Sequence, residues 1–98
     1  MSKFGRTSRG GKRRDGNHAD LVRQIRKLPG FEVLDVADLS NLGFDLIVYS
    51  PKSRRNHLCE VKNPATEWKL EPSEQAMSED WPRDWCIIED IEDVLTLR

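Results

Sequence analysis

Three charged residues within two apolar runs are the part of the chain best suited to chemistry. Asp45 lies in the run 43–49, and Glu60 and Lys62 lie in the run 57–62. Both runs are rich in β-branched and aromatic residues and are bounded by Gly, Pro, Ser or Asn, a composition typical of strands. A charge in such a run is costly to bury unless it is paired or bound to a metal ion. These residues are therefore candidates for a functional site.

The spacing of the three residues indicates which chemistry they can share. Side chains alternate between the two faces of a strand, so Glu60 and Lys62 project together, and Asp45 joins them if the strands are neighbours. Two converging carboxylates suit a hard divalent cation, and a lysine beside them can hold a water molecule or stabilise developing negative charge. This is the chemistry of metal-assisted phosphodiester hydrolysis. The simpler interpretations are a turn aspartate and an exposed ion pair between the glutamate and the lysine.

The same residues resemble the signature of the PD-(D/E)XK nucleases. An Asp follows Gly-Phe, a spacer of 14 residues (46–59) comes next, and then Glu-Val-Lys. The chain is similar, more narrowly, to small phage-type members of the VRR-NUC branch. Four segments carry this resemblance in the family's order, and an Asp-Trp-Pro follows them at 80–82. The segments are 15–26, 43–48, 59–63 and 70–76.

The resemblance implies roles for the residues at the family's positions. Asp45 and Glu60, helped by the carbonyl of Val61, are expected to bind Mg²⁺ or Mn²⁺, and Lys62 is expected to position or activate the attacking water. Gln75 matches the family's second-helix glutamine, which contacts a phosphate or a water on the metal. A solvent-facing helix residue is the alternative for Gln75.

His18 stands where the family commonly has an acid on the first helix. Helical spacing places it three residues before Leu21 and four before Val22, on the face that packs toward the sheet. The resemblance implies that His18 replaces the acid as a metal ligand or water-orienting base. The alternative is a histidine at the edge of the core, and Asp20 is then the candidate metal-facing acid.

Apolar periodicity and turn residues predict the helices and strands that position these residues. Residues 1–14 are predicted to be a flexible basic arm, and 15–98 a single nuclease domain. The predicted order is α-β-β-β-α-β-α, which matches the restriction-endonuclease-like fold: a central mixed sheet of about four strands flanked by helices. The predicted helices are 17–28, 72–80 and 89–97, and the predicted strands are 31–37, 43–49, 57–62 and 84–89.

Charge is distributed unevenly along the chain. Residues 1–27 carry nine Lys or Arg against two acids, and the remainder carries seven against fifteen, which together give the net charge of −1. A basic arm can approach phosphate while the acidic part holds metal; the alternative for the arm is a solubilising tail. For the basic residues within 52–55, which join two predicted strands, the alternative is a solvated hairpin tip. The candidate DNA contacts are Lys12, Arg13, Arg14, Lys52, Arg54 and Arg55.

Composition sets the broader expectations. No run is long enough for a membrane span and no signal-peptide pattern follows the basic start, so a soluble intracellular protein is expected. Phage or bacterial origin is what the resemblance implies. Cys59 and Cys86 lack zinc-site spacing and are expected to be reduced thiols. The predicted function is a metal-dependent DNA endonuclease. Its small size favours structure-selective cutting by a homodimer, and the resemblance makes branched DNA, such as a Holliday junction, one candidate substrate. The rivals are a nuclease-fold protein that binds DNA or a phage protein without cutting, and a DNA-mimicking inhibitor.

Overall fold

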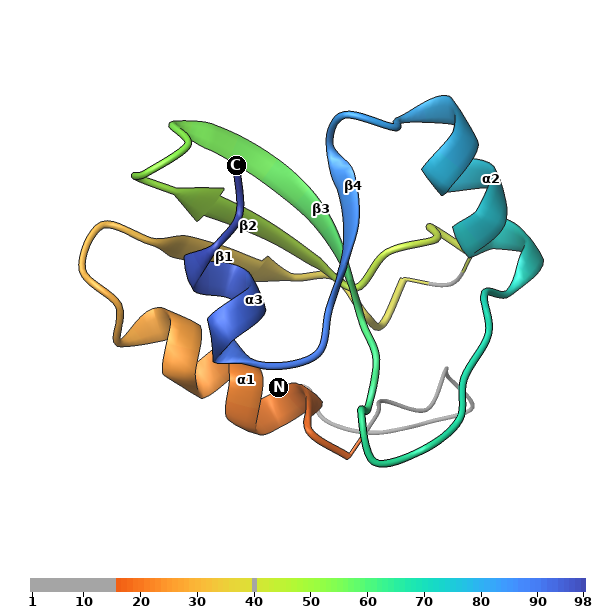
Figure 1. The fold of residues 1–98 in the computed structure, drawn as a ribbon, viewed down its shortest axis with the longest axis horizontal. Helices are drawn as coiled ribbons and strands as arrows, with labels where there is room; N and C mark the ends of the chain where they lie inside the picture. Colours follow the sequence, from red (N-terminus) through yellow and green to blue (C-terminus); the bar gives the residue numbers. More distant parts are fainter. Residues whose placement is uncertain (1–15, 40) are drawn as a thin grey trace.

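The computed structural model describes residues 16–39 and 41–98, and these residues form an α/β fold (Figure 1). The predicted order of helices and strands is confirmed, whereas the predicted basic arm lies outside the described residues. The elements are α1 (His18–Arg26), β1 (Glu32–Asp35), β2 (Leu46–Ser50), β3 (Arg55–Val61), α2 (Pro72–Asp80), β4 (Trp85–Ile88) and α3 (Ile91–Leu95).

The four strands form one mixed sheet in the order β1-β2-β3-β4. β1, β2 and β3 pair antiparallel, and the register sets Asp35 opposite Leu46 and Leu46 opposite Cys59. β4 runs parallel to β3, with Cys59 opposite Cys86. A parallel pair needs a crossover connection, and here the segment that contains α2 provides it. The end of β3 and the start of α2 are therefore joined by one loop.

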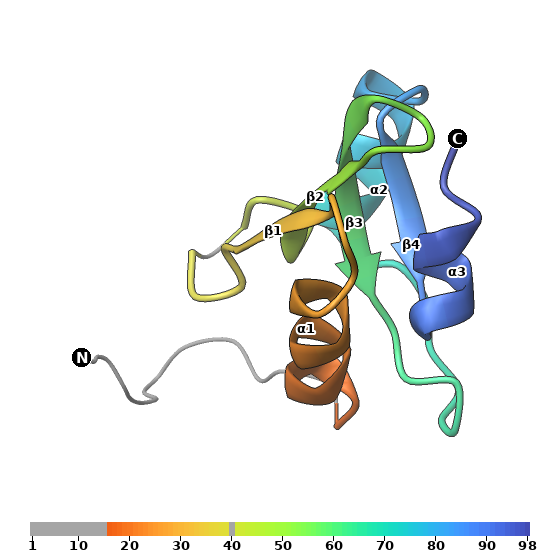
Figure 2. The same ribbon diagram turned by 90° about the vertical axis from the view of Figure 1, so that its left-hand side faces the viewer.

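The hydrophobic core lies between one face of the sheet and the helices α1 and α3, which lie side by side in Figures 1 and 2. α1 contributes the stripe predicted from its periodicity, and α3 contributes one buried residue. The buried apolar residues of these helices and of the strands they cover are Leu21, Val22, Ile25, Leu46, Val48, Cys59, Val61, Ile88 and Val94. None of the helices within the described residues is long and apolar enough to cross a membrane.

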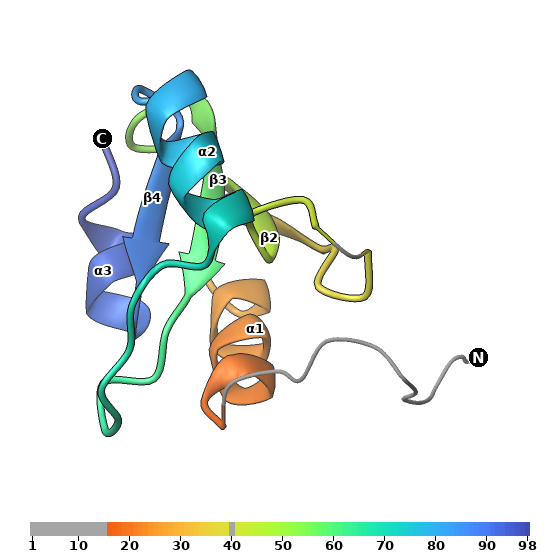
Figure 3. The same ribbon diagram turned by 90° about the vertical axis from the view of Figure 1, so that its right-hand side faces the viewer.

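α2 packs on the opposite face, in front of β3 and β4 in Figure 3. Gly43 fits between this helix and the sheet: it has φ +85°, a Cβ built on it would lie 2.4 Å from the Ser73 carbonyl oxygen, and its own carbonyl accepts a 2.7 Å hydrogen bond from Trp85 Nε1. This conformation explains why β2 begins at Leu46 and not at residue 43 as predicted. Asp45 consequently lies at the mouth of the strand.

His57 makes the stability of the fold depend on pH. Its side chain is buried, and Nε2 lies 2.8 Å from Ser53 Oγ. Burial, assisted by the charge of Arg55, holds the pKa of His57 below its usual value. The unfolded chain therefore binds a proton more readily than the folded one as the pH falls through about 6.5, and stability is lost below that pH. In urea titrations at pH 7.5 and 5.5, we expect this loss to be smaller in His57→Gln, whereas an equal loss in both proteins would contradict the assignment.

Candidate active site

Asp45 lies directly beside the segment of β3 that carries Glu60. Its amide donates to the Cys59 carbonyl at 2.9 Å, and its carboxylate Oδ2 accepts from the Val61 amide at 3.0 Å. The two residues that Asp45 contacts, Cys59 and Val61, are the sequence neighbours of Glu60. A third hydrogen bond, from the Val36 amide to the Asp45 carbonyl at 2.9 Å, fixes Asp45 from the β1 side. The structure thus places Asp45 beside the segment of β3 that carries Glu60.

Lys62 directly follows β3 and forms the second half of the site. Its Nζ lies 3.5 Å from Glu60 Oε2 and 2.9 Å from Glu74 Oε1. Asp45, Glu60, Lys62 and Glu74 are all less than 10% exposed. We refer to these four residues as the acid–lysine cluster. The cluster thus gathers three carboxyl groups and one ammonium group in the buried part of the protein.

Glu74 is the member of the cluster that the sequence did not predict. It is the third helical residue of α2, where its carboxylate accepts from the Glu71 amide at 3.0 Å in a capping box, with Pro72 in the first turn. The sequence signal for this cap is Glu71-Pro-Ser-Glu74, an N-cap followed three residues later by glutamate. That signal predicts the start of a helix. It does not predict that the crossover brings the same carboxylate to Lys62.

The surroundings of Lys62 keep it charged. Burial alone lowers the pKa of its ammonium group, but the hydrogen bond to Glu74 and the charges of Glu60 and Glu74 outweigh burial and raise that pKa above its ordinary value. The indole of Trp68 also lies over the ammonium group, 5.7 Å from ring centroid to Nζ, and donates from Nε1 to Glu89. A lysine held in this state can orient a ligand or stabilise negative charge, and it is a poor proton acceptor at neutral pH.

His18 is buried, as expected for a residue that faces the sheet, and its Nε2 lies 3.2 Å from Asp35 Oδ2. Asp35 pairs with the core residue Leu46 across β1 and β2, so the His18–Asp35 pair belongs to the α1 face of the sheet. The alternative acid on this helix, Asp20, is exposed and forms an ion pair with Arg23. The hydrogen bonds of the described residues thus join His18 to Asp35 and leave Asp20 at the surface.

Gln75 and the basic hairpin lie outside the cluster. Gln75 is exposed and its Nε2 donates to Glu79 at 2.7 Å, so α2 presents Glu74 to Lys62 where the resemblance implied Gln75. Lys52 and Arg54 are exposed at the β2–β3 hairpin. Arg55 is half-buried, bonded to the carbonyls of Arg83 and Arg98 and to Asp84.

The hairpin lies at the far end of β3, about 20 Å from Lys62 at the rise of a strand (Figure 1). Its cations could contact a distant phosphate but are not part of the site. The remaining candidate DNA contacts lie outside the described residues: Lys12, Arg13 and Arg14.

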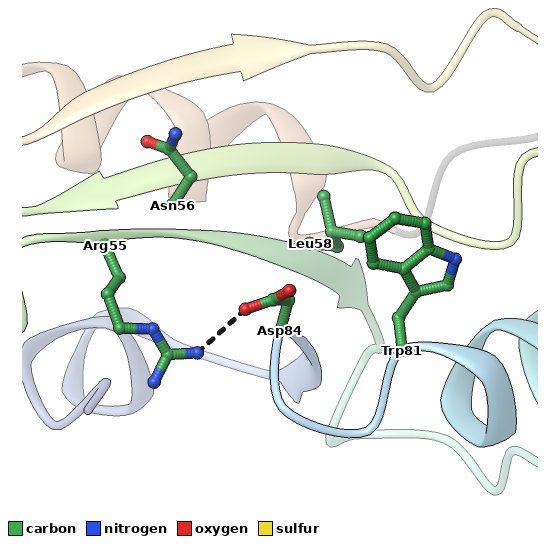
Figure 4. A pocket seen from close by; sticks show the side chains of 5 residues that line it. All are labelled: Arg55, Asn56, Leu58, Trp81 and Asp84. Carbon is green, nitrogen blue, oxygen red and sulfur yellow. Dashed lines mark hydrogen bonds and ion pairs between the residues drawn. The ribbon is translucent and has the colours of Figure 1, made fainter.

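A shallow hollow of about 320 Å³ lies near the start of β3, lined by Arg55, Asn56, Leu58, Trp81 and Asp84. Figure 4 shows the indole of Trp81 beside Leu58 and the ion pair between Arg55 and Asp84, whose atoms are 3.0 Å apart. The charges of Arg55 and Asp84 neutralise each other, and Leu58 and Trp81 form the apolar part of the lining. This hollow contains none of the acid–lysine cluster, and the paired acids and lysine lie elsewhere on the sheet.

Asn17 joins α1 to the strand ends that carry the site. It is the N-cap residue of α1, but its side chain makes no capping hydrogen bond; its Nδ2 donates to the Lys62 carbonyl at 3.2 Å and to the Glu89 carbonyl at 2.7 Å. Because each such bond contributes about 1 kcal/mol, we expect Asn17→Ala to lower the free energy of unfolding by about 1–2 kcal/mol in urea titrations. Asn56→Ala, at an exposed position, should change it by less than about 0.5 kcal/mol. Equal effects of the two substitutions would contradict this role.

The oxygen atoms of the cluster are donors of the type that hard divalent cations prefer. Among residues 16–39 and 41–98, no three His, Cys, Asp or Glu side chains are arranged to hold a metal ion by themselves. Mg²⁺, however, is commonly held by one or two carboxylates together with water and a substrate phosphate. Asp45 and Glu60 supply two buried carboxylates, and the Val61 carbonyl belongs to the same segment. Oxygen donors of this kind match Mg²⁺ or Mn²⁺ and not a softer metal.

Both cysteines are free, as expected from the sequence, with their sulfur atoms 3.5 Å apart between β3 and β4. Comparison of the chain with models of protein families, with curated proteins and with solved structures finds no match. The functional argument therefore rests on the residues of the cluster and their geometry.

Proposed function

We propose that the protein is a Mg²⁺- or Mn²⁺-dependent endodeoxyribonuclease that hydrolyses phosphodiester bonds at the acid–lysine cluster. One observation carries the proposal: Asp45 and Glu60 lie on adjoining strand segments, both buried, with the Lys62 ammonium 3.5 Å from Glu60. A buried carboxylate is costly unless it is paired or binds a cation. We propose that Asp45 and Glu60 are buried because they bind a divalent cation.

The residues of the cluster have separate roles in the proposed reaction. Asp45 and Glu60, with the Val61 carbonyl, would hold the cation, and a bound cation would supply Lewis-acid chemistry toward a phosphate and a water molecule. Lys62 remains protonated, so it orients the attacking water by donating a hydrogen bond and stabilises the charge that develops on phosphorus oxygens. The ring of Trp68 lies over the ammonium group and is itself held by a hydrogen bond to Glu89.

The wider proposal follows the resemblance. The mixed four-stranded sheet with flanking helices supports a restriction-endonuclease-like fold of the VRR-NUC type, in one domain that begins near residue 15. So small a domain has little surface for reading base sequence, which favours recognition of DNA shape. We therefore propose branched DNA, including four-way junctions, as substrate, with a homodimer cutting two strands. We propose that the basic hairpin and the N-terminal segment contact phosphates of the same DNA away from the cluster.

The test is cleavage of labelled DNA by purified protein. Linear duplex, flapped duplex and four-way junction are each incubated with Mg²⁺, Mn²⁺ or EDTA, alongside Lys62→Ala as the inactive control. We expect cleavage with either metal, none in EDTA and none by the variant, with the junction cut fastest. Cleavage of no substrate in any metal, with DNA binding intact in both proteins, would contradict the endonuclease.

A second candidate function is a DNA-binding module of nuclease fold without hydrolytic activity. The pairing of His18 with Asp35 favours it, because the first helix then places no carboxylate within the acid–lysine cluster. This module would bind DNA with a strong dependence on salt and would leave every substrate intact. The same cleavage assay, combined with a binding titration at two salt concentrations, separates the two functions.

A further inference from the structure

The two cysteines lie opposite each other on neighbouring strands. Cys59 of β3 pairs with Cys86 of β4 in the parallel part of the sheet, and their sulfur atoms are 3.5 Å apart. Neighbouring strands lie about 4.8 Å apart, and disulfides join Cα atoms that are about 4.4–6.8 Å apart. Small rotations of the two side chains can therefore bring the sulfur atoms to bonding distance while the strands stay paired.

The two thiols differ in their access to solvent. Cys59 is completely buried in the core, whereas Cys86 is partly exposed. A dissolved oxidant therefore reaches Cys86 first. The hydrogen bond with Cys59 lowers the pKa of the Cys86 thiol, and this effect outweighs the opposing effect of burial. Since the thiolate is the nucleophile in cysteine chemistry, Cys86 is the residue that reacts with the oxidant, and Cys59 is in place to react with Cys86.

We propose that Cys59 and Cys86 form a reversible oxidation site, which closes to a disulfide bond when the protein meets hydrogen peroxide. The Cys86 thiolate attacks one peroxide oxygen, the O–O bond breaks and hydroxide leaves, which gives a sulfenic acid on Cys86. The Cys59 sulfur then attacks the Cys86 sulfur, the S–O bond breaks, and the oxygen leaves as water with the Cys59 proton. In total the two thiols lose two electrons, and one peroxide is reduced to two molecules of water.

This oxidation site does not depend on the proposed nuclease function, but it lies next to the acid–lysine cluster. The crossover between the two cysteines carries Lys62 and Glu74, and the Cys59 carbonyl accepts from the Asp45 amide. A disulfide closes this crossover into a loop at its base, which restricts the unfolded chain more than the folded one. Oxidation should therefore raise the thermal unfolding midpoint by at least about 8 °C.

Reaction of the full-length protein with hydrogen peroxide tests the proposal. The whole chain has two cysteines, so only one intramolecular disulfide can form. Wild type, Cys59→Ala and Cys86→Ser are reduced, freed of reductant and treated with peroxide, with and without dimedone, which traps sulfenic acids. Thiols are counted in denaturant, and peptide mapping without reductant identifies the products. Thermal unfolding of the oxidised and re-reduced wild type measures the effect on stability.

The expected result is that the wild type loses both thiols, yields a peptide pair linked through Cys59 and Cys86, and recovers both thiols with dithiothreitol. Cys59→Ala should form a dimedone adduct on Cys86. Cys86→Ser should lose its remaining thiol at least about tenfold more slowly than Cys59→Ala, because reactivity follows exposure. A wild type that keeps both thiols, or forms disulfides only between two molecules, would overturn the proposal. A disulfide that lowers the unfolding midpoint would also overturn it, since the paired strands would then not accommodate the bond.

Discussion

Glu60→Gln is expected to abolish DNA cleavage while leaving the protein at least as stable as the wild type. A bound metal ion would stabilise the transition state by several kcal/mol. Loss of one of the two carboxylates proposed to bind it should therefore slow cleavage at least about a hundredfold. Glutamine is close to isosteric and neutral. It removes a buried charge next to Glu74, while Lys62 keeps its 2.9 Å partner. Single-turnover cleavage and thermal unfolding of the same preparation measure the two effects.

Glu32→Gln is the control for this prediction, because Glu32 is an exposed carboxylate on β1. It should change neither cleavage nor stability. The account is contradicted if Glu60→Gln cuts DNA at the wild-type rate. It is also contradicted if the variant loses stability to the same extent as activity, since Glu60 would then serve the fold.

Gly43→Ala is expected to unfold much of the protein at 37 °C or lower its midpoint by about 10 °C or more. The left-handed conformation at φ +85° costs a residue with a Cβ about 1–2 kcal/mol. The added carbon also meets the backbone oxygen of Ser73 at 2.4 Å, which cannot rotate away as a flexible side chain can. In a domain of this size each kcal/mol shifts the midpoint by about 4–8 °C. Differential scanning calorimetry measures the shift.

Gly16→Ala is the matched control. Its φ is not in the left-handed region, and the nearest atom to an added Cβ, Asn63 Nδ2, lies at an ordinary contact distance of 3.5 Å. Its midpoint should stay within about 3 °C of the wild type. Equal shifts in the two variants would mean that the close approach of residue 43 to α2 does not position the loop before Asp45.

The sequence predicted the elements well where local chemistry decides them. Pro72 suits the first turn of a helix and α2 begins there; the spacing of Leu21, Val22 and Ile25 predicts the buried face of α1. Alternation also grouped Glu60 with Lys62 correctly. Strand ends were less accurate, because a glycine in an unusual conformation and the packing of α2 decide where β2 starts.

The partners of the charged residues could not be predicted in the same way. Glu74 lies 12 residues after Lys62, and only the crossover between two parallel strands brings them together. His18 was correctly placed on the inner face of α1, but its contact with Asp35 depends on how β1 packs below that helix. Periodicity fixes the face on which a residue lies. It does not fix the residue on the neighbouring element that it meets.

The most direct test of the proposed site compares one carboxylate of the cluster with one outside it. Wild type, Asp45→Asn and Asp38→Asn, the last at an exposed loop position, are assayed at single turnover on a labelled four-way junction in Mg²⁺ and in EDTA. We predict that wild type and Asp38→Asn cleave in Mg²⁺ only, and that Asp45→Asn cleaves in neither. Cleavage by Asp45→Asn at the wild-type rate, or undiminished wild-type cleavage in EDTA, would contradict a metal-dependent site at the acid–lysine cluster.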